Sequence, residues 1–355
     1  MKKLSVLVVG MGKRGKHHAA AFNANPNFQV TGICDIDAEK LKSATVSLGN
    51  PECGSDAAAL AKKVRPDVFC FCTMPHIRTE MLKAAVDCGA KLVAFEKPIA
   101  LNSKIAVELK DMIAKSGIKA VVSHQHRYGV HYRKVKEIAE SGILGRTQMV
   151  YASATGWMTH MMSHMIDYMR WYNGNEEAEW VIGQASGKSK FSDNHPSPDY
   201  ITGMIQFANG ARGIVECGAG ASDQPEVAKW WGKNRICIQG TTGFAEVLTN
   251  GGWRAVTKNG ISSGEGAMNY DLDMPPYIQE MADWLNGGKI HQCNFDNAFK
   301  GCEIVNGIMR SAIHGGQVKL PLAGVMDELA ELKAKLADST AIANSFNKAE
   351  FPGCV

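Results

Sequence analysis

The sequence lacks the features that would place it in several large classes of protein. No uninterrupted apolar stretch approaches the roughly 20 residues needed to cross a bilayer, so we expect no membrane partner. The formal net charge is only +4, and no basic tract or basic helix is present that would follow a phosphate backbone. We therefore expect no nucleic-acid partner.

Paired cysteines are also missing. The ten cysteines are dispersed, no CxxC pair occurs, and several fall within predicted strands or helices. Reduced thiols explain this pattern most simply, so we predict a cytoplasmic location. The first residues imitate a short signal peptide, but glycines and then Lys13, Arg14 and Lys16 break the apolar run. A strand that leads into a loop is the better interpretation.

Length and composition indicate two domains. The 355 residues, of which 45% are hydrophobic and 21% charged, can bury a large core and exceed the usual size of one domain. In the first third, short β-rich runs alternate with helix-period segments, which is typical of βαβ units. The expected strands are 4–9, 30–34, 68–72, 92–95 and 119–123. The pattern predicts an α/β Rossmann domain over 1–124, with a doubly wound parallel sheet.

The pattern changes after residue 124. A Met-rich helix is expected at about 159–172, and a run of strands from Trp180 to about Lys258. Within that run, Asn209-Gly210 and Asn250-Gly251 mark antiparallel hairpins. Before the Met-rich helix, a helix is expected at about 131–141 and a strand at 148–154, and further helices are expected at about 276–286, 295–314 and 326–345. We predict an α+β domain over 125–355, built on an open antiparallel sheet that joins subunits into a homodimer or homotetramer.

A glycine-rich loop joins the first strand to the first helix. Its glycines permit a tight turn, and the helix N-terminus offers N–H groups to a pyrophosphate. Asp35, twenty residues after Gly15, ends the second strand, where a carboxylate accepts hydrogen bonds from ribose and repels a 2′-phosphate. The sequence therefore favours NAD over NADP, and the alternative is a glycine-rich turn that binds nothing. The loop that fits GxGxxG is Gly10, Met11, Gly12, Lys13, Arg14 and Gly15.

Two opposite charges and a proline follow the strand at 92–95. In a doubly wound sheet, ligands bind outside the carboxyl ends of the strands, and Glu96-Lys97-Pro98 lies at such an end. A partly desolvated lysine beside a cationic nicotinamide has a lowered pKa, which suits it to proton transfer. Pro98 restricts the backbone of Lys97 and so helps to aim the amine.

These motifs, with Thr73-Met74-Pro75 before a helix, resemble the Gfo/Idh/MocA family, named for glucose-fructose oxidoreductase, inositol dehydrogenase and rhizopine catabolism. The resemblance covers most of the chain, because SHMIDYMRWYNG and the strands after it also match. It implies that Lys97 faces the nicotinamide and the substrate hydroxyl, before a peptide bond that is often cis. The family usually has a histidine shortly after the Thr-x-Pro segment, whereas this sequence has Thr79 there, with His76 nearby. The implied cofactor contacts outside the loop are Asp35, Thr73, Pro75, His76, Glu96, Lys97 and Gln125.

Three polar residues share one face of the Met-rich helix. His160, His164 and Asp167 are spaced i, i+4 and i+7. The resemblance implies that His164 is a catalytic acid or base, while His160 stands where inositol dehydrogenases have an assisting aspartate. His160 is then a candidate to bind a sugar hydroxyl, and Asp167 to orient His164. A zinc site of these three residues and a merely packed His164 are the alternatives, and we predict no metal.

Other substrate contacts are predicted from position. Arg127 and Tyr128 lie where the chain passes to the second domain, and Trp157 is a candidate to stack on a sugar ring. The interpretation is an NAD-dependent dehydrogenase that oxidises a secondary hydroxyl of a sugar, glycoside or cyclitol, with Lys97 and His164 in proton transfer. The alternatives are a glycosidase or lyase that retains NAD without net redox change, and a non-catalytic NAD-binding sensor.

Overall fold

The computed structural model describes residues 2–228 and 232–338, and the chain forms two compact units. The first unit comprises Met1–Ala100, Ile105–Tyr128 and Asn269–Phe299. The second comprises Leu101–Lys104, Gly129–Met268 and Lys300–Val355. The first unit thus contains a late segment that lies far beyond the predicted boundary at residue 124.

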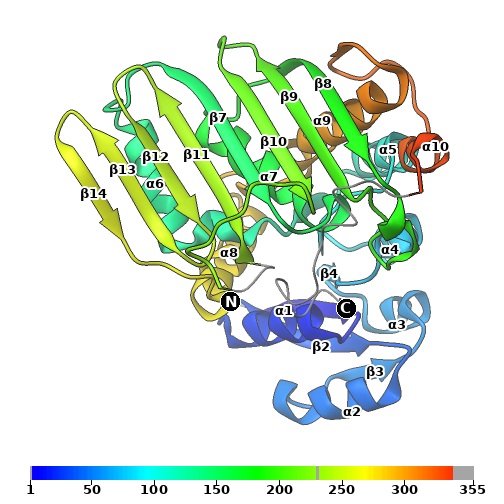
Figure 1. The fold of residues 1–355 in the computed structure, drawn as a ribbon. Coiled ribbons are helices and arrows are strands. Elements are labelled where there is room, and N and C mark those ends of the chain that lie inside the picture. The colour runs from blue at the N-terminus through cyan, green and yellow to red at the C-terminus, as the bar shows by residue number, and fades with distance from the viewer. Residues whose placement is uncertain (1, 229–231, 339–355) are drawn as a thin grey trace. The chain divides into compact units, whose positions relative to one another are not determined.

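A six-stranded parallel sheet forms the centre of the first unit, in the order β3-β2-β1-β4-β5-β6. This is the Rossmann order, and it confirms the predicted fold class. Strands β2, β3 and β4 of this sheet are labelled in Figure 1. Strands β4 and β5 are buried along their whole length, as expected of strands covered on both faces. The strands are β1 Leu4–Val9, β2 Phe28–Cys34, β3 Glu52–Gly54, β4 Val68–Phe71, β5 Leu92–Phe95 and β6 Lys119–Val122. The helices between them are α1 Lys13–Ala24, α2 Ala38–Thr45, α3 Ala57–Val64, α4 Arg78–Asp87 and α5 Ser103–Ser116.

The late segment adds helix α8 (Tyr270–Leu285) to the first unit. Tyr277, Ile278 and Met281 are fully buried in the same apolar cluster as Val6 of β1. The helix begins earlier than the predicted residue 276, because Asn269 caps it and its side chain accepts a hydrogen bond from Asp271 N at 3.0 Å. The described part of this segment forms no named strand. Its helix α8 buries its apolar face by packing against the first sheet.

The second unit is built on a nine-stranded sheet in the order β14-β13-β12-β11-β7-β10-β9-β8-β15. The hairpins at Asn209-Gly210 and Asn250-Gly251 are confirmed, since β9 pairs antiparallel with β10 and β12 with β13. One central pair, β7 and β10, is parallel, because the chain between them crosses over through a helix. The sheet is therefore mixed. Its strands are β7 Thr147–Ala154, β8 Ala178–Ser186, β9 Tyr200–Phe207, β10 Arg212–Gly218, β11 Asn234–Gly240, β12 Phe244–Leu248, β13 Gly252–Thr257, β14 Gly260–Gly264 and β15 Val318–Lys319.

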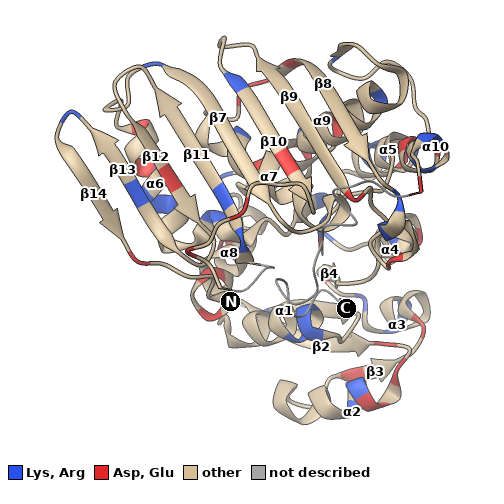
Figure 2. Cartoon of the chain, in the orientation of Figure 1, with Lys and Arg blue, Asp and Glu red and all other residues tan. Residues whose placement is uncertain are grey.

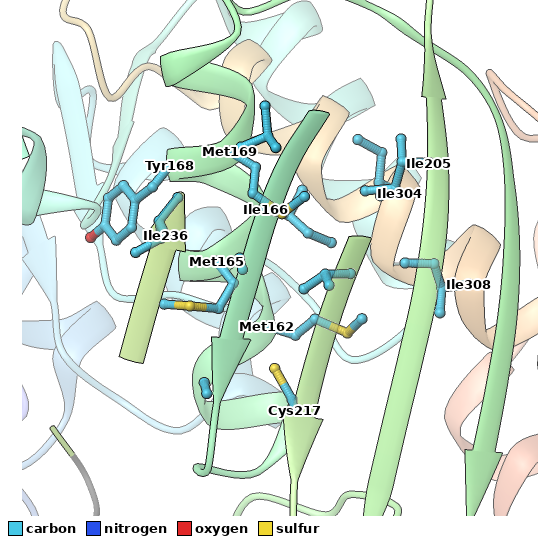
Figure 3. Close-up of a cluster of buried hydrophobic side chains, with 14 of the residues drawn as sticks. Met162, Met165, Ile166, Tyr168, Met169, Ile205, Cys217, Ile236, Ile304 and Ile308 are labelled. Carbon is cyan, nitrogen blue, oxygen red and sulfur yellow. The ribbon is translucent and has the colours of Figure 1, made fainter. Parts of the chain in front are cut away.

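Helices cover one face of this sheet. Figure 3 shows side chains of α7 (Met158–Tyr172) and α9 (Phe295–His314) directed toward the strands, where Met162, Ile166, Ile205 and Ile308 belong to one buried cluster. Helix α6 (Val130–Glu140) contacts β12 and β13. Helix α10 spans Glu328–Lys335, and residues 339–345 of the helix predicted over 326–345 lie outside the described residues.

The opposite face carries a row of exposed apolar side chains. Ile182 of β8 lies directly opposite Met204 of β9, which lies opposite Ile214 of β10. Their exposed fractions are 42%, 37% and 38%, although neighbouring inward residues such as Ile205 are fully buried. Alternation along each strand thus leaves one apolar strip without cover within the described chain.

Charged residues are mixed over both units. Figure 2 shows Lys and Arg interspersed with Asp and Glu along the ribbon in this orientation. Of the helices that the structure describes, none combines the length and apolar character needed to span a bilayer. Every cysteine within the described ranges is a free thiol.

Candidate active site

The phosphate loop has a geometry that only glycine permits at two positions. Gly10 adopts a φ of +86°, and a Cβ there would lie 2.7 Å from the carbonyl oxygen of Cys72. A Cβ on Gly15 would lie 1.7 Å from the Gly10 oxygen. Helix α1 then begins at Lys13 without a side-chain cap on Gly12. Its first N–H groups are therefore available to an anionic ligand, which fits the pyrophosphate of NAD.

Asp35 lies at the carboxyl end of β2 and is fixed against this loop. Its Oδ2 accepts a hydrogen bond from Met11 N at 2.6 Å, and its Oδ1 accepts one from Asp37 N at 2.9 Å. The side chain is buried, with 9% of the residue exposed. The predicted ribose acceptor and the predicted phosphate loop are thus one connected structure, while Lys13 is exposed on α1.

The segment after β4 contains a buried hydroxyl group that has no hydrogen-bond partner in the described structure. This atom is Oγ1 of Thr73, one of the predicted cofactor contacts. Pro75 is buried at the start of a short 3₁₀ helix, Pro75–Ile77, whereas His76 is exposed. Thr79 bonds Glu108 at 3.4 Å on the surface. A buried hydroxyl with no protein partner beside the phosphate loop is suited to hydrogen-bond a cofactor.

Arg78 is a site residue that the sequence reasoning missed. It is 1% exposed, its Nη1 donates to the Thr73 oxygen at 3.2 Å, and its Nε lies 3.4 Å from the Pro98 oxygen. The guanidinium therefore ties the segment after β4 to the segment after β5. The signal in the sequence was a cation in the first turn of the helix that follows Pro75.

Glu96 is held as a carboxylate in the interior of the first unit. Burial alone would raise its pKa, but the hydrogen bond from His18 Nε2 at 3.1 Å and the charges of Arg14 and Lys97 outweigh burial and lower it strongly. His18 was also missed by the sequence reasoning. It lies on α1, one turn after Gly15, and is 1% exposed.

Lys97 follows as a half-buried amine at the end of β5. Burial, opposed by Glu96 and assisted by the charges of Arg14 and Arg78, lowers its pKa to about 8. The Lys97-Pro98 peptide bond is cis. A lysine in this environment exists partly as the neutral amine near neutral pH, so it is able to accept a proton.

Helix α8 supplies an aromatic residue to the same region. The Arg14 guanidinium lies 4.0 Å from the ring centroid of Tyr270, and His17 stacks on that ring at 5.0 Å. His126 Nδ1 lies 3.2 Å from Asp273 Oδ2. Tyr270 was not identified from the sequence, because its partner Arg14 belongs to the phosphate loop. That loop ends at Gly15, which lies 255 residues before Tyr270.

The residues at the predicted boundary between the two domains are buried, and their side chains form hydrogen bonds within the first unit. Gln125 accepts a hydrogen bond from Ser123 at 3.1 Å, and Arg127 donates to the Gln292 oxygen at 3.2 Å. Tyr128 donates to Glu280, and burial raises its pKa far above the usual range. All three are buried within the first unit, in the 3₁₀ helix Gln125–Tyr128. A role of Arg127 and Tyr128 in substrate binding stays a prediction.

The second unit contains the histidines of α7. His164 is 5% exposed, its Nδ1 lies 3.2 Å from the hydroxyl of Tyr168, and the two rings are stacked. Asp167 is buried on the same helix. His160 is less buried and its ring centroid lies 5.1 Å from that of His195.

An ordered loop brings His195 to this helix. Thr159 Oγ1 donates to the Pro196 oxygen at 2.6 Å, and Thr159 N donates to Ser197 Oγ at 3.1 Å. Trp157, which precedes α7, is buried, and the Lys190 amine lies 4.9 Å from its ring centroid. The second unit thus groups the predicted residues Trp157, His160 and His164, while the first unit groups the loop, Asp35, Thr73, Glu96 and Lys97.

Two family models match the chain. Residues 4–124 match an oxidoreductase family with an NAD-binding Rossmann fold, and residues 132–246 match the GFO/IDH/MocA C-terminal domain. The two matches account for the core of each sheet.

Named proteins are similar over most of the chain at low identity. An inositol 2-dehydrogenase of Streptomyces avermitilis is 23% identical over 316 residues, which cover 84% of this chain and 88% of that protein. A D-glucoside 3-dehydrogenase of Escherichia coli is 23% identical over 238 residues, covering 58% and 68%. The structure of a levoglucosan dehydrogenase in complex with NADH and levoglucosan superposes with a TM-score of 0.77 at 19% identity, covering 90% of this chain and 100% of that one. At this identity the structural match establishes the fold.

Proposed function

Because the chain belongs to the GFO/IDH/MocA oxidoreductase family, with an NAD-binding Rossmann domain, we propose that it oxidises a secondary hydroxyl of a sugar, glycoside or cyclitol. The observation that carries this proposal is the position of Lys97. Its half-buried amine, with a pKa lowered to about 8, follows β5 of the same sheet whose β1 leads into the phosphate loop. A proton acceptor at the carboxyl edge of a dinucleotide-binding sheet is what alcohol oxidation requires.

The first unit holds the cofactor through several separate groups. The N–H groups at the start of α1 bind the pyrophosphate, Asp35 accepts from the ribose hydroxyls, and Thr73 Oγ1 gains the partner that it lacks. Arg78 keeps the Thr73 and Pro98 segments together. NAD, when bound, supplies the acceptor for the hydride that leaves the carbinol carbon.

Lys97 removes the hydroxyl proton. Glu96 beside it stays ionised, because His18 and Arg14 stabilise the carboxylate, and so it does not take the proton itself. The added positive charge of an oxidised nicotinamide would lower the pKa of Lys97 further and favour the neutral amine. Holding the hydroxyl group within reach of this amine contributes to the rate by proximity.

His164 is proposed as the second proton-transfer group. The contact between its Nδ1 and the Tyr168 hydroxyl supports this role, because it fixes the ring and offers a path for a proton through a hydroxyl. His160 and Trp157 are the proposed sugar contacts of the second unit. The names of the relatives, an inositol 2-dehydrogenase and a D-glucoside 3-dehydrogenase, favour a polyhydroxylated ring as substrate.

The exposed strip Ile182, Met204 and Ile214 favours a homo-oligomer. Three apolar side chains in register across adjacent strands form a flat surface that a second copy of the same sheet would cover. The free thiols of the described cysteines favour a reducing compartment, and we propose the cytoplasm.

The test is NADH formation by the purified chain with NAD+ across a panel of inositols, free aldoses and glycosides. We expect NADH absorbance to rise in proportion to the substrate consumed, and to depend on Lys97. Loss of substrate without free NADH would instead support a closed redox cycle with retained NAD. A flat trace with every substrate intact would contradict the proposal.

A further inference from the structure

Three side chains with metal-binding atoms converge next to the phosphate loop. His18 of α1, Cys70 of β4 and Cys72 just after β4 each offer one ligand atom, and these atoms lie within 4.8 Å of one another. Cys70 and Cys72 share one face of the strand, because side chains alternate along it. A Cβ built on Gly15 of α1 would meet Cys72 Cβ at 3.8 Å, in ordinary van der Waals contact, so the part of α1 that carries His18 lies beside the thiols.

We propose that His18, Cys70 and Cys72 form a binding site for a thiophilic divalent cation of the Zn²⁺ class. Two thiolates and one imidazole are ligands that zinc prefers over harder cations. Bonds of about 2.3 Å to sulfur and about 2.0 Å to nitrogen place tetrahedral donors about 3.5–3.8 Å apart. To reach this spacing, the distances between the three donor atoms must shorten by about 1 Å, which rotation of the side chains supplies.

The hydrogen bonding of His18 provides a second, independent observation. Its Nε2 lies 3.1 Å from Glu96 Oε1, and an ionised carboxylate only accepts, so Nε2 is the donor. Its Nδ1 is buried and has no hydrogen-bond partner in the described structure. The nitrogen that is left for a ligand is thus Nδ1. A carboxylate that orients the ring of a metal-binding histidine is a recurrent feature of zinc sites.

The surroundings of the three ligands allow a cation to enter, and deprotonation of the two thiols balances its charge. Cys70 and His18 are almost fully buried, whereas Cys72 is partly exposed and provides the path from solvent. Binding breaks the S–H bonds of both thiols, releases those protons with any proton held on Nδ1, and forms two metal–sulfur bonds and one metal–nitrogen bond without a change of oxidation state. A water molecule on the side of Cys72 completes the coordination. The site does not depend on the proposed dehydrogenase activity.

The experiment is a titration of the reduced, metal-free, full-length chain with Co²⁺ as a spectroscopic probe, followed by Zn²⁺. We expect a thiolate-to-cobalt charge-transfer absorption that saturates at a single equivalent and disappears when Zn²⁺ displaces the probe. Cys70→Ser and Cys72→Ser should each remove most of this absorption. Cys88→Ser is the matched control, because Cys88 is also a half-buried thiol of the first unit and bonds only locally, to Ala85.

Glu96→Gln tests the positioning role of the carboxylate. We expect the variant to bind the same number of Zn²⁺ ions with an affinity about 10- to 100-fold lower. Losses of this size are typical when a residue that hydrogen-bonds a metal-binding histidine is replaced. The absence of charge-transfer absorption in the wild-type chain would overturn the proposal, whatever the variants do. Equal absorption in the wild type, Cys70→Ser and Cys72→Ser would overturn it as well. A chain that binds Co²⁺ through these cysteines but forms no NADH would contradict only the proposed activity.

Discussion

In the first unit strands β4 and β5 are buried along their whole length, whereas in the second unit strands β9 and β10 alternate between buried and exposed residues. A sheet covered on both faces leaves only the ends of its strands for function. In the first unit the polar site residues accordingly follow strand ends, as Asp35, Thr73 and Lys97 do. A sheet covered on one face leaves the other face for a partner and places polar site residues on the covering helix.

The two units also differ in electrostatics. In the first, the pKa of Glu96 is lowered against burial by the His18 hydrogen bond and the neighbouring cations, and the pKa of Lys97 is lowered mainly by burial. In the second, the residues of α7 are histidines among methionines, and His164 contacts a neutral tyrosine hydroxyl. The proposed proton acceptor of the first unit is therefore surrounded by charged groups, whereas His164 of the second unit has a hydroxyl group as one of its partners.

Replacing the amine in the first unit should have the largest effect. Lys97→Ala removes the proposed proton acceptor, and we expect kcat for alcohol oxidation to fall about 100- to 10,000-fold while NAD affinity changes little. Steady-state kinetics and calorimetric NAD titration measure the two quantities. Lys83→Ala, which removes an exposed amine paired with Asp87, is the control and should retain full turnover.

The same assay compares the two units directly. His164→Asn should lower kcat less than Lys97→Ala, because in the proposed mechanism His164 relays a proton that Lys97 accepts first. Turnover that survives Lys97→Ala but is lost in His164→Asn would reverse the assignment of roles.

A core substitution in the second unit should affect stability and leave cofactor binding intact. Met162 is fully buried between α7 and the sheet (Figure 3), and Met162→Ala should lower the free energy of unfolding by about 2–5 kcal/mol. Urea unfolding followed by circular dichroism measures this change. Met204→Ala, on the exposed face, should cost much less, and a comparable loss from both would mean that the strip around Met204 is already covered in solution.

Asp35→Asn should weaken NAD binding by about 10- to 100-fold, because it removes the charged acceptor that also holds Met11 N. Selectivity against NADP should shrink in the same titrations, since the repulsion of a 2′-phosphate is lost. Asp37→Asn is a close control: Asp37 caps α2 from an exposed position, and asparagine caps helices equally well. A loss of NAD affinity in Asp37→Asn as large as in Asp35→Asn would contradict the ribose assignment.

The pH dependence should reflect the amine of the first unit. Because the pKa of Lys97 is lowered to about 8 and the neutral form accepts the proton, kcat/KM should rise about tenfold per pH unit below that value and then level off. The rising limb should be absent from the residual activity of Lys97→Ala. A profile that is flat below the pKa of Lys97 would argue that another group accepts the proton.

The smallest effect on turnover is expected at the exposed face of the second sheet. Met204→Lys places a charge in the middle of the strip formed with Ile182 and Ile214, so light scattering should show a smaller assembly. Turnover per chain should stay within about twofold, because the strip lies on the face away from α7. An unchanged molar mass would contradict the proposed oligomer surface.

Local patterns anticipated most of the regular structure. Strands β1, β4, β5 and β6 were expected within a residue of their observed bounds, since each is a short apolar run between turn residues. Strand β3 was missed because it has three residues, none of them buried. The parallel pairing of β7 with β10 was missed as well, because residue alternation does not reveal the direction of a neighbouring strand.

The candidate site likewise contains residues that local patterns predicted and residues that they missed. The phosphate loop, Asp35 and Glu96-Lys97-Pro98 follow from residues next to one another in the chain, because a turn, a helix start and a strand end are local events. His18, Arg78 and Tyr270 were not found, since their contacts with Glu96, Pro98 and Arg14, respectively, join segments that are separate in the sequence. The contact of Cys70 and Cys72 with His18 is of this second kind.

The sequence by itself therefore determined a Rossmann sheet with an NAD-binding loop, a lysine at its carboxyl edge, and a following α+β region. Only the tertiary structure decided that α8 packs on the first sheet, that Glu96 is ionised against His18 and Arg14, and that two thiols face an imidazole. The reason is physical: secondary structure depends on neighbours within a few residues, whereas burial, pKa and ligand geometry depend on groups that meet only after the chain has folded.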